Sequence, residues 1–488
     1  MRVLFSLFSA TLATCMMAET GTWNSSTVGS SIAYTVLEAT GTPVQDINGK
    51  VMTIVYLENL GLPKIGQNTN AEDVAWLRQQ GYQVIELDYG HHSKAVSPYI
   101  NQDIIAINQS LKGGTFCHSS CSEYRSYILM EGYRIKRDIA YYHDDPTVYN
   151  FPDVYKDSKG DSLYLDLVYP ANPSTTVPVL VTFSYSNSFA TNDGGTLTDR
   201  NKHKRMYLPY FWGGFNDSFV EGASAVGLAW AVCDHPKYCD WGQGKYTGGA
   251  NKSLGAIEVN PDAVRKVKSA IRTIRGIGRE LGLNSQVAVT GFSRGSTAAA
   301  LAVGDRSDDT QEDTIRGLFP KESSAVNCAI LGPGVFDYSQ MAVQTREYKN
   351  MSAYVSAFPT YGWNLQGAVG NIVSRASAPC LFYFNSDDDS NYRTCALAMQ
   401  SLLDSLGIET EVLTDYGTGH SVPQQMGQLL QMYQFLTRQV SGESHLQKVE
   451  AKQPQSMLYD LQGRSKLGQN GGYFFGYGQK VFSSGYSL

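Results

Sequence analysis

Residues 286–303 place a strand, a tight turn and a helix directly one after another, and this feature constrains the fold most. Residues 286–290 are rich in small and β-branched side chains, as in a buried strand, and the Ala-rich run 296–303 predicts a helix. The turn at 291–295 has the pattern G-x-S-x-G with Ser293 at its centre. Its two glycines allow a turn so tight that the serine takes a strained backbone conformation, with its hydroxyl clear of the sheet. The pattern alone arises by chance in a chain with 47 glycines, but its position between strand and helix makes Ser293 a candidate nucleophile.

Length and composition exclude several classes of protein. A chain of 488 residues is long enough for a large core and for more than one domain. Hydrophobic residues make up 42% of it, which excludes disorder for most of its length. The net charge is −6 and there is no basic block, so we expect neither nucleic acid nor an anionic membrane surface as a partner. The sequence leaves the oligomeric state open.

The N-terminal residues predict export. Arg2, the apolar run 3–17 and Ala18 follow the pattern of a signal peptide over residues 1–18. Cys15 also stands in an approximate lipoprotein cleavage box, although the Thr before it departs from the usual small residues. No later segment has about 18 uninterrupted apolar residues, so we expect no transmembrane segment and a periplasmic, cell-surface or secreted protein.

Two close pairs of cysteines suit an oxidising compartment. Cys117 and Cys121 form one pair, Cys233 and Cys239 the other, and we predict a disulfide for the second. His118 next to Cys117 suggests zinc as an alternative. No second ligand pair stands at metal-site spacing, so we predict no metal.

Strand and helix patterns divide the chain into three parts. These are an N-terminal α/β module at 19–125, a main domain at 126–440 and a short tail at 441–488. The module has strand patterns at 51–57 and 82–87 around a helix pattern at 71–80, the order of a parallel βαβ unit, with Asn70 as the expected helix cap. It is either a partial copy of the main sheet or an extension of it.

The main domain alternates strands with helices. After an expected antiparallel pair at 133–142 and 162–169, strand patterns follow at 179–183, 227–233, 286–290, 325–331, 379–384 and 409–414. Helix patterns follow near 219–225 and at 262–281, 391–406 and 422–440, and the second of these carries a basic row expected to face solvent: Arg265, Lys268, Arg272, Arg275 and Arg279. Residues 333–377 lack a clear period and predict a lid. The succession predicts an α/β fold with a doubly wound, mostly parallel sheet.

A serine hydroxyl needs a base within hydrogen-bond reach and an acid to orient that base. In an open α/β sheet both should lie beyond the carboxyl ends of later strands. His420 follows the strand that ends near 414, and glycines beside it let the imidazole turn back over the sheet. Asp387, Asp388 and Asp389 follow the preceding strand, although a run of three acids is also a common solvated loop.

Residues from about 130 to 440 resemble the α/β-hydrolase fold, in its esterase and dienelactone-hydrolase-like branch. The resemblance lies in G-x-S-x-G, the acid after a strand and Gly-His420, in the chain order serine, acid, histidine. It implies a Ser-His-Asp triad. The family's Gly-x-x-Asp pattern places Asn385 at the glycine position, where Asn would tolerate a positive φ, and so selects Asp388 as the acid. Asp337, after the earlier strand, is the alternative.

The same resemblance implies an oxyanion hole made of two backbone N–H groups. One belongs to the residue after the nucleophile, Arg294, and the other to the loop after the third strand. That loop often contains His-Gly-Gly in the family, whereas this chain has Ser184-Tyr185-Ser186-Asn187, so Tyr185 or Ser186 would be the second donor. The resemblance implies no metal and no organic cofactor.

The tail has the patterns Tyr-Asp-Leu-x-Gly-Arg at 459–464 and Gly-x-Phe-Phe-Gly-Tyr at 472–477, followed by Lys-Val at 480–481. Through them it resembles the C-terminal tails on exported proteins of Gram-negative polysaccharide degraders. The alternative is a small hairpin that packs on the rest of the protein.

We therefore interpret the chain as an exported serine hydrolase of carboxylic esters, with acetyl or feruloyl groups on plant polysaccharide as the candidate substrates. A first alternative is a serine peptidase of prolyl-oligopeptidase type, but residues 19–125 are too few for the propeller that usually gates such enzymes. A second is an inactive hydrolase-fold binding protein, which would have a broken triad.

Overall fold

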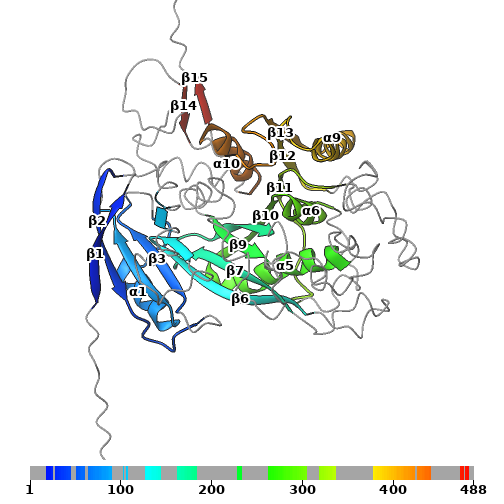
Figure 1. Ribbon diagram of the computed structural model, residues 1–488. Helices are drawn as coiled ribbons and strands as arrows, with labels where there is room; N and C mark the ends of the chain where they lie inside the picture. The colour runs from blue at the N-terminus through cyan, green and yellow to red at the C-terminus, as the bar shows by residue number, and fades with distance from the viewer. Residues whose placement is uncertain are drawn as a thin grey trace, which may run out of the picture.

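A computed structural model of the chain describes residues 18–25, 28–45, 51–60, 64–90, 103, 106–107, 127–143, 162–183, 228–233, 262–304, 318–336, 377–423, 426–440, 473–476 and 479–482. Two sheets make up most of this structure. The smaller is N-terminal and drawn in blue, and the larger runs from cyan to gold (Figure 1).

The larger sheet has eight strands in the described part of the chain, in the order β13-β12-β11-β10-β8-β9-β7-β6. The neighbours from β13 to β9 run parallel, whereas β7 and β6 are antiparallel at one edge. The strands are β6 (Tyr133–His143), β7 (Ser162–Pro170), β8 (Val177–Phe183), β9 (Ala229–Cys233), β10 (Leu283–Gly291), β11 (Cys328–Leu331), β12 (Cys380–Phe384) and β13 (Thr410–Thr414). The predicted mostly parallel sheet with an antiparallel opening pair is confirmed.

Helices cover both faces of the larger sheet. They are α5 (Asp262–Gly278), α6 (Arg294–Leu301), α9 (Ser390–Ser405) and α10 (Met426–Val440), with a short 3₁₀ helix η6 (Arg279–Leu281) after α5. Neighbouring strand residues face opposite cores: Val289 and Phe382 pack with α5, α6 and α9, whereas Ala288 and Leu381 pack with α10. Burial on both faces explains why these strands read as continuous apolar runs.

The N-terminal sheet has five strands in the described part, in the order β1-β2-β4-β3-β5. They are β1 (Glu19–Ser25), β2 (Ser30–Leu37), β3 (Thr53–Glu58), β4 (Gln83–Asp88) and β5 (Tyr127–Met130). Strands β3 and β4 are parallel and joined by α1 (Asn70–Gln79), as the βαβ pattern predicts. In the described part of the chain the five strands of this sheet pair with one another and not with those of the larger sheet. Strand β5 belongs to the N-terminal sheet although it lies beyond residue 125.

The helix cap of the N-terminal module differs from the prediction by one residue. Thr69, not Asn70, caps α1: its side chain accepts a hydrogen bond from the backbone N–H of Glu72, and the Glu72 carboxylate accepts one from the N–H of Thr69. This reciprocal capping box satisfies two N–H groups that the first turn of a helix leaves without intrahelical acceptors.

Buried charges join the two sheets. Arg134 of β6 donates from Nε to Asp73 of α1 at 2.9 Å, and the Asp73 side chain is fully buried. Arg137, also on β6, lies 4.8 Å from the ring centroid of Tyr127 in β5, and the phenol of Tyr127 donates to Asp166 of β7 at 2.7 Å. Because removing one partner of a buried pair leaves an uncompensated charge, these contacts fix the module against the antiparallel edge of the larger sheet.

The basic row predicted for α5 faces solvent only in part. Arg272 is fully buried, whereas Arg279, just beyond the helix, is 77% exposed as predicted. Arg272 is buried because both sides of the helix are covered. Ile271 packs into the sheet core, and the polar side chains of Lys266, Ser269 and Thr273 elsewhere around the helix are also fully buried. Ser269 Oγ donates to the carbonyl of Tyr141 in β6, a strand of the same sheet, at 2.5 Å. The side chain of Arg265 lies outside the described residues.

Several sequence predictions concern residues beyond the described ranges. These are the signal peptide up to residue 17, the helix near 219–225, most of the lid, and the cluster of Cys117, His118 and Cys121. Cys233 is buried at the end of β9, and Cys239 lies outside the described residues, so the disulfide stays a prediction. In the tail, β14 (Tyr473–Gly476) and β15 (Gln479–Phe482) form an antiparallel hairpin. None of the described helices is long and apolar enough to span a membrane.

Candidate active site

Ser293 sits on a strained turn between β10 and α6. Its backbone has φ 55° and ψ −124°, a region that a residue with a side chain rarely adopts. Glycine is required at the start of the turn, because a Cβ on Gly291 would lie 2.1 Å from the carbonyl oxygen of Gly295. The elbow that the sequence predicts is therefore present, with Ser293 at the N-cap position of α6.

Hydrogen bonds from neighbouring strands hold this elbow. The phenol of Tyr383 in β12 donates to the carbonyl of Gly291 at 3.3 Å. Ser296 Oγ in the first turn of α6 donates to the carbonyl of Gly332, directly after β11, at 2.8 Å. These contacts tie the end of β10 to the ends of the next two strands, so the serine sits on a rigid part of the sheet.

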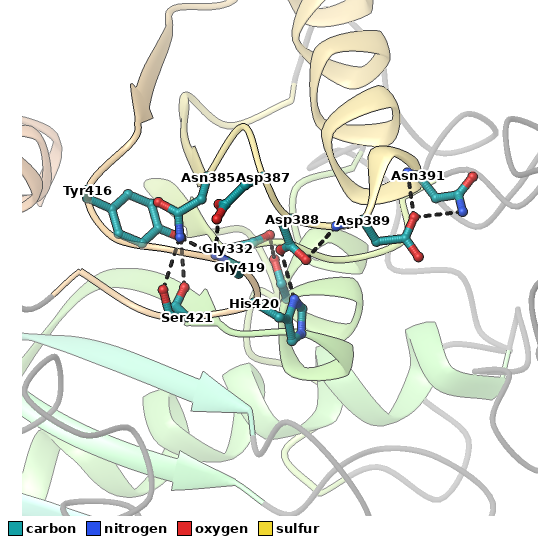
Figure 2. A network of polar contacts seen from close by, with 11 residues as sticks. Gly332, Asn385, Asp387, Asp388, Asp389, Asn391, Tyr416, Gly419, His420 and Ser421 are labelled. Atoms are coloured by element: carbon teal, nitrogen blue, oxygen red, sulfur yellow. Dashed lines mark hydrogen bonds and ion pairs between the residues drawn. The ribbon is translucent and has the colours of Figure 1, made fainter.

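His420 pairs with Asp388 (Figure 2). Nδ1 of His420 lies 2.9 Å from Oδ2 of Asp388, and the carboxylate is 3% exposed while the imidazole is 33% exposed. A carboxylate only accepts hydrogen bonds, so Nδ1 carries the proton and Nε2 is left as a proton acceptor. The other carboxylate oxygen, Oδ1, accepts the backbone N–H of Asp389 at 2.7 Å. The acid selected by the family pattern is thus the one that the structure brings to the histidine.

The two neighbouring aspartates have separate contacts (Figure 2). Asp387 Oδ1 accepts the backbone N–H of Gly419, the residue before His420, at 2.7 Å. Asp389 caps α9, because its side chain accepts the N–H of Asn391 at 2.9 Å. The run of three acids is therefore not simply a solvated loop.

Asn385 does not have the backbone conformation that its place in the family pattern suggested. It is not among the described residues with a positive φ. Its fully buried side chain instead accepts the N–H of Gly417 at 2.9 Å and donates to Gly419 O at 2.9 Å and to Ser421 Oγ at 3.0 Å. An asparagine stands here because the side-chain amide bonds the next loop, a role that a glycine could not fill.

Two aromatic rings contact the imidazole of His420. The ring of Tyr392, in the first turn of α9, stacks on it at a centroid distance of 4.8 Å and an interplanar angle of 27°. The ring of Phe292 lies 4.6 Å away at 40°. Because Phe292 directly precedes Ser293, this contact brings the histidine against the elbow. Among the described residues the structure records the hydrogen bond from His420 to Asp388 and none from His420 to Ser293.

The phenol of Tyr416 forms a hydrogen bond within the loop that carries His420. It donates to the carbonyl of Ser421 at 2.8 Å. Burial raises the pKa of this phenol above its ordinary value, and the negative charge of Asp388 raises it further. Tyr416 therefore stays protonated and remains a donor at neutral pH.

The residues proposed for the oxyanion hole are only partly described. Arg294 is the first residue of α6, so its backbone N–H has no acceptor within the helix. Tyr185, Ser186 and the alternative acid Asp337 lie outside the described residues. No group of three or more His, Cys, Asp or Glu side chains suited to a metal ion occurs in the described ranges.

The contacts of Asn385 and Tyr392 were not predicted. Both residues touch the loop of His420 from positions about 30 residues earlier in the chain, and no local spacing indicates such a contact. The capping of α9 by Asp389 could have been found, because an aspartate directly before a helix pattern is a common N-cap.

Comparison with known proteins gives structural similarity only. No protein-family model and no curated protein sequence matches the chain. A truncated carbohydrate esterase from gut microbiota superposes with a TM-score of 0.42 and 17% identity, over 60% of this chain and 96% of that one. An esterase of Thermogutta terrifontis with butyrate bound gives 0.41 and 18%, over 64% and 97%. A bifunctional GH43-CE protein of Bacteroides eggerthii also gives 0.41 and 18%, over 63% of this chain and 38% of that one. Similarity of this degree carries no argument about activity.

Proposed function

We propose that the chain is a serine hydrolase of carboxylic esters with the α/β-hydrolase fold. The observation that carries the proposal is the pair of Asp388 and His420, 2.9 Å apart, whose imidazole lies against the strained elbow of Ser293. Serine, acid and histidine follow the ends of β10, β12 and β13, in the chain order of α/β-hydrolases. The strand order, with an antiparallel pair before a parallel succession, supports the same fold.

The proposed reaction proceeds through an acyl-enzyme. Ser293 Oγ attacks the ester carbonyl carbon while Nε2 of His420 takes the hydroxyl proton, and Asp388 stabilises the resulting imidazolium. The N–H of Arg294, with that of Tyr185 or Ser186, would bind the oxyanion of the tetrahedral intermediate. The intermediate then expels the alcohol, which takes the proton from Nε2. Water attacks the acyl-enzyme in the same way and releases the carboxylic acid.

For the substrate we propose acetyl or feruloyl esters on plant polysaccharide, met outside the cytoplasm. This part rests on the resemblance of the tail at 459–481 and on the signal-peptide pattern at 1–18. Intact-mass analysis of protein recovered from outside the cell checks the export step: a chain beginning after residue 18 is expected, and one retaining Met1 would contradict it.

A substrate panel tests the proposed activity. The wild-type protein, Ser293→Ala and the control Ser405→Ala, an exposed serine on α9, are assayed on p-nitrophenyl acyl esters, peptide amides and acetylated xylan. We expect ester hydrolysis by the wild type and Ser405→Ala, and loss of turnover in a folded Ser293→Ala. Preferential cleavage of peptide amides would assign the chain to peptidases. Equal activity of the wild type and Ser293→Ala would refute the proposed nucleophile.

A further inference from the structure

The loop that carries His420 needs external support. It contains Gly417 and Gly419, and Gly419 has φ 57°. Because glycine can adopt many backbone conformations, the residues of the loop alone do not fix its conformation. The loop joins β13 to α10 and is exposed at several positions, and one third of the His420 side chain is open to solvent. A base has to be held to within about 0.5 Å for efficient proton transfer, so another part of the chain must fix this loop.

Asn385 contacts the residues on both sides of His420. Its Nδ2 donates to the carbonyl of Gly419, which precedes the histidine, and to Oγ of Ser421, which follows it, while its Oδ1 accepts the N–H of Gly417. Figure 2 shows the amide beside Gly419 and Ser421. With the bond from Gly417, the amide uses two donors and an acceptor on the loop 417–421. Its 0% exposure means that water cannot replace these bonds without opening the site.

The contact also links the base to the acid. Asn385 stands three residues before Asp388, and the N–H of Asp388 donates to the carbonyl of Asn385 at 3.2 Å, so both belong to one turn. Through this turn the chain fixes the carboxylate and, by the Asn385 side chain, the loop that presents the imidazole. Asp387 adds a further bond to the N–H of Gly419.

We propose that Asn385 is a positioning residue: its side-chain amide sets the orientation of the His420 imidazole between Asp388 and the elbow. The inference rests on the proposed function, since it assigns the amide a task in the reaction of Ser293. It concerns a contact of this chain in particular, because the family pattern has a glycine at this position. Asn385 touches no reacting atom and acts through the loop.

The principal test is Asn385→Leu, which keeps a similar volume but cannot form the three hydrogen bonds. We expect kcat for p-nitrophenyl acetate to fall by about 100-fold with KM nearly unchanged, because a misplacement of about 1 Å costs that much. In a His420→Ala background the same substitution should have no further effect on the residual rate. Asn391→Leu removes an amide that bonds Asp389 at 2.8 Å and serves as the matched control with normal kcat.

A second variant and an NMR measurement complete the test. If Asn385→Leu does not fold, Ser421→Ala removes one of the three bonds and should lower kcat by about fivefold. In proton NMR, the downfield Nδ1–H signal of His420 should be present in the wild type and lost or broadened in Asn385→Leu. That signal reports orientation without any substrate, so an inactive wild type that still shows the effect would refute the esterase proposal alone. An Asn385→Leu variant with an intact signal and wild-type kcat, or an equal loss in the His420→Ala background, would overturn the positioning role.

Discussion

Substituting Gly291 by alanine should displace the elbow and slow the reaction without unfolding the protein. The added Cβ would lie 2.1 Å from the Gly295 carbonyl oxygen and 2.5 Å from the backbone nitrogen of Ser296, and both neighbours are backbone atoms that cannot rotate away. Restoring ordinary contact requires the start of α6 to move by about 1 Å, and Ser293 lies between the two clashing positions. We expect kcat to fall by about 100-fold and the free energy of unfolding to fall by about 1–3 kcal/mol.

The assay compares Gly291→Ala with Gly407→Ala. A Cβ on Gly407 meets nothing within 4 Å, but its φ of 77° strains alanine, which costs roughly 1–2 kcal/mol after the end of α9 and away from the elbow. Hydrolysis of p-nitrophenyl acetate gives kcat, and thermal unfolding followed by circular dichroism gives stability. Both variants should melt earlier and only Gly291→Ala should lose turnover. Full kcat in a folded Gly291→Ala would refute the steric argument for the elbow.

Three further substitutions separate the contacts of the imidazole and of its acid. Asp388→Asn should lower kcat by about 10⁴-fold, whereas Asp389→Ala should cost about 1 kcal/mol of stability through the lost cap of α9 and leave kcat unchanged. Steady-state kinetics and thermal melts distinguish the two, and an active Asp388→Asn would move the acid to Asp337. Tyr392→Leu removes the ring stacked on His420 and should lower kcat by about fivefold while KM stays the same. A Tyr392→Leu variant that raises only KM would mean that the ring contacts substrate instead.

The strands and the elbow could be predicted because their signals are local. Continuous apolar runs mark strands that are buried on both faces, and the G-x-S-x-G pattern marks a turn whose first position, Gly291, has no room for a side chain. The prediction that Arg272 faces solvent was wrong, because a helical period assumes that one side of α5 is exposed. In the structure the buried side chains of α5 lie all around the helix. The cap of α1 was misplaced although Thr69 and Glu72 have the spacing of a capping box.

The candidate site was predictable in its residues more than in its contacts. The order of serine, acid and histidine follows from strand ends, and the family pattern selected Asp388 from three adjacent acids. The bonds of Asn385 and Asp387 to the His420 loop could not be predicted, since each joins backbone groups of one loop to a side chain of another. Such contacts depend on how the loops after β12 and β13 pack against each other, and the spacing of hydrophobic residues does not predict this packing.

Covalent labelling identifies the nucleophile without any assumption about the substrate. The wild-type protein is treated with a fluorophosphonate probe, digested and mapped by mass spectrometry, with Ser293→Ala and His420→Ala treated in parallel. We expect one adduct, on Ser293 in the peptide that joins β10 to α6, formed far more slowly in His420→Ala and absent in Ser293→Ala. An adduct on another serine, or no adduct on a folded wild-type protein that hydrolyses esters, would contradict this expectation.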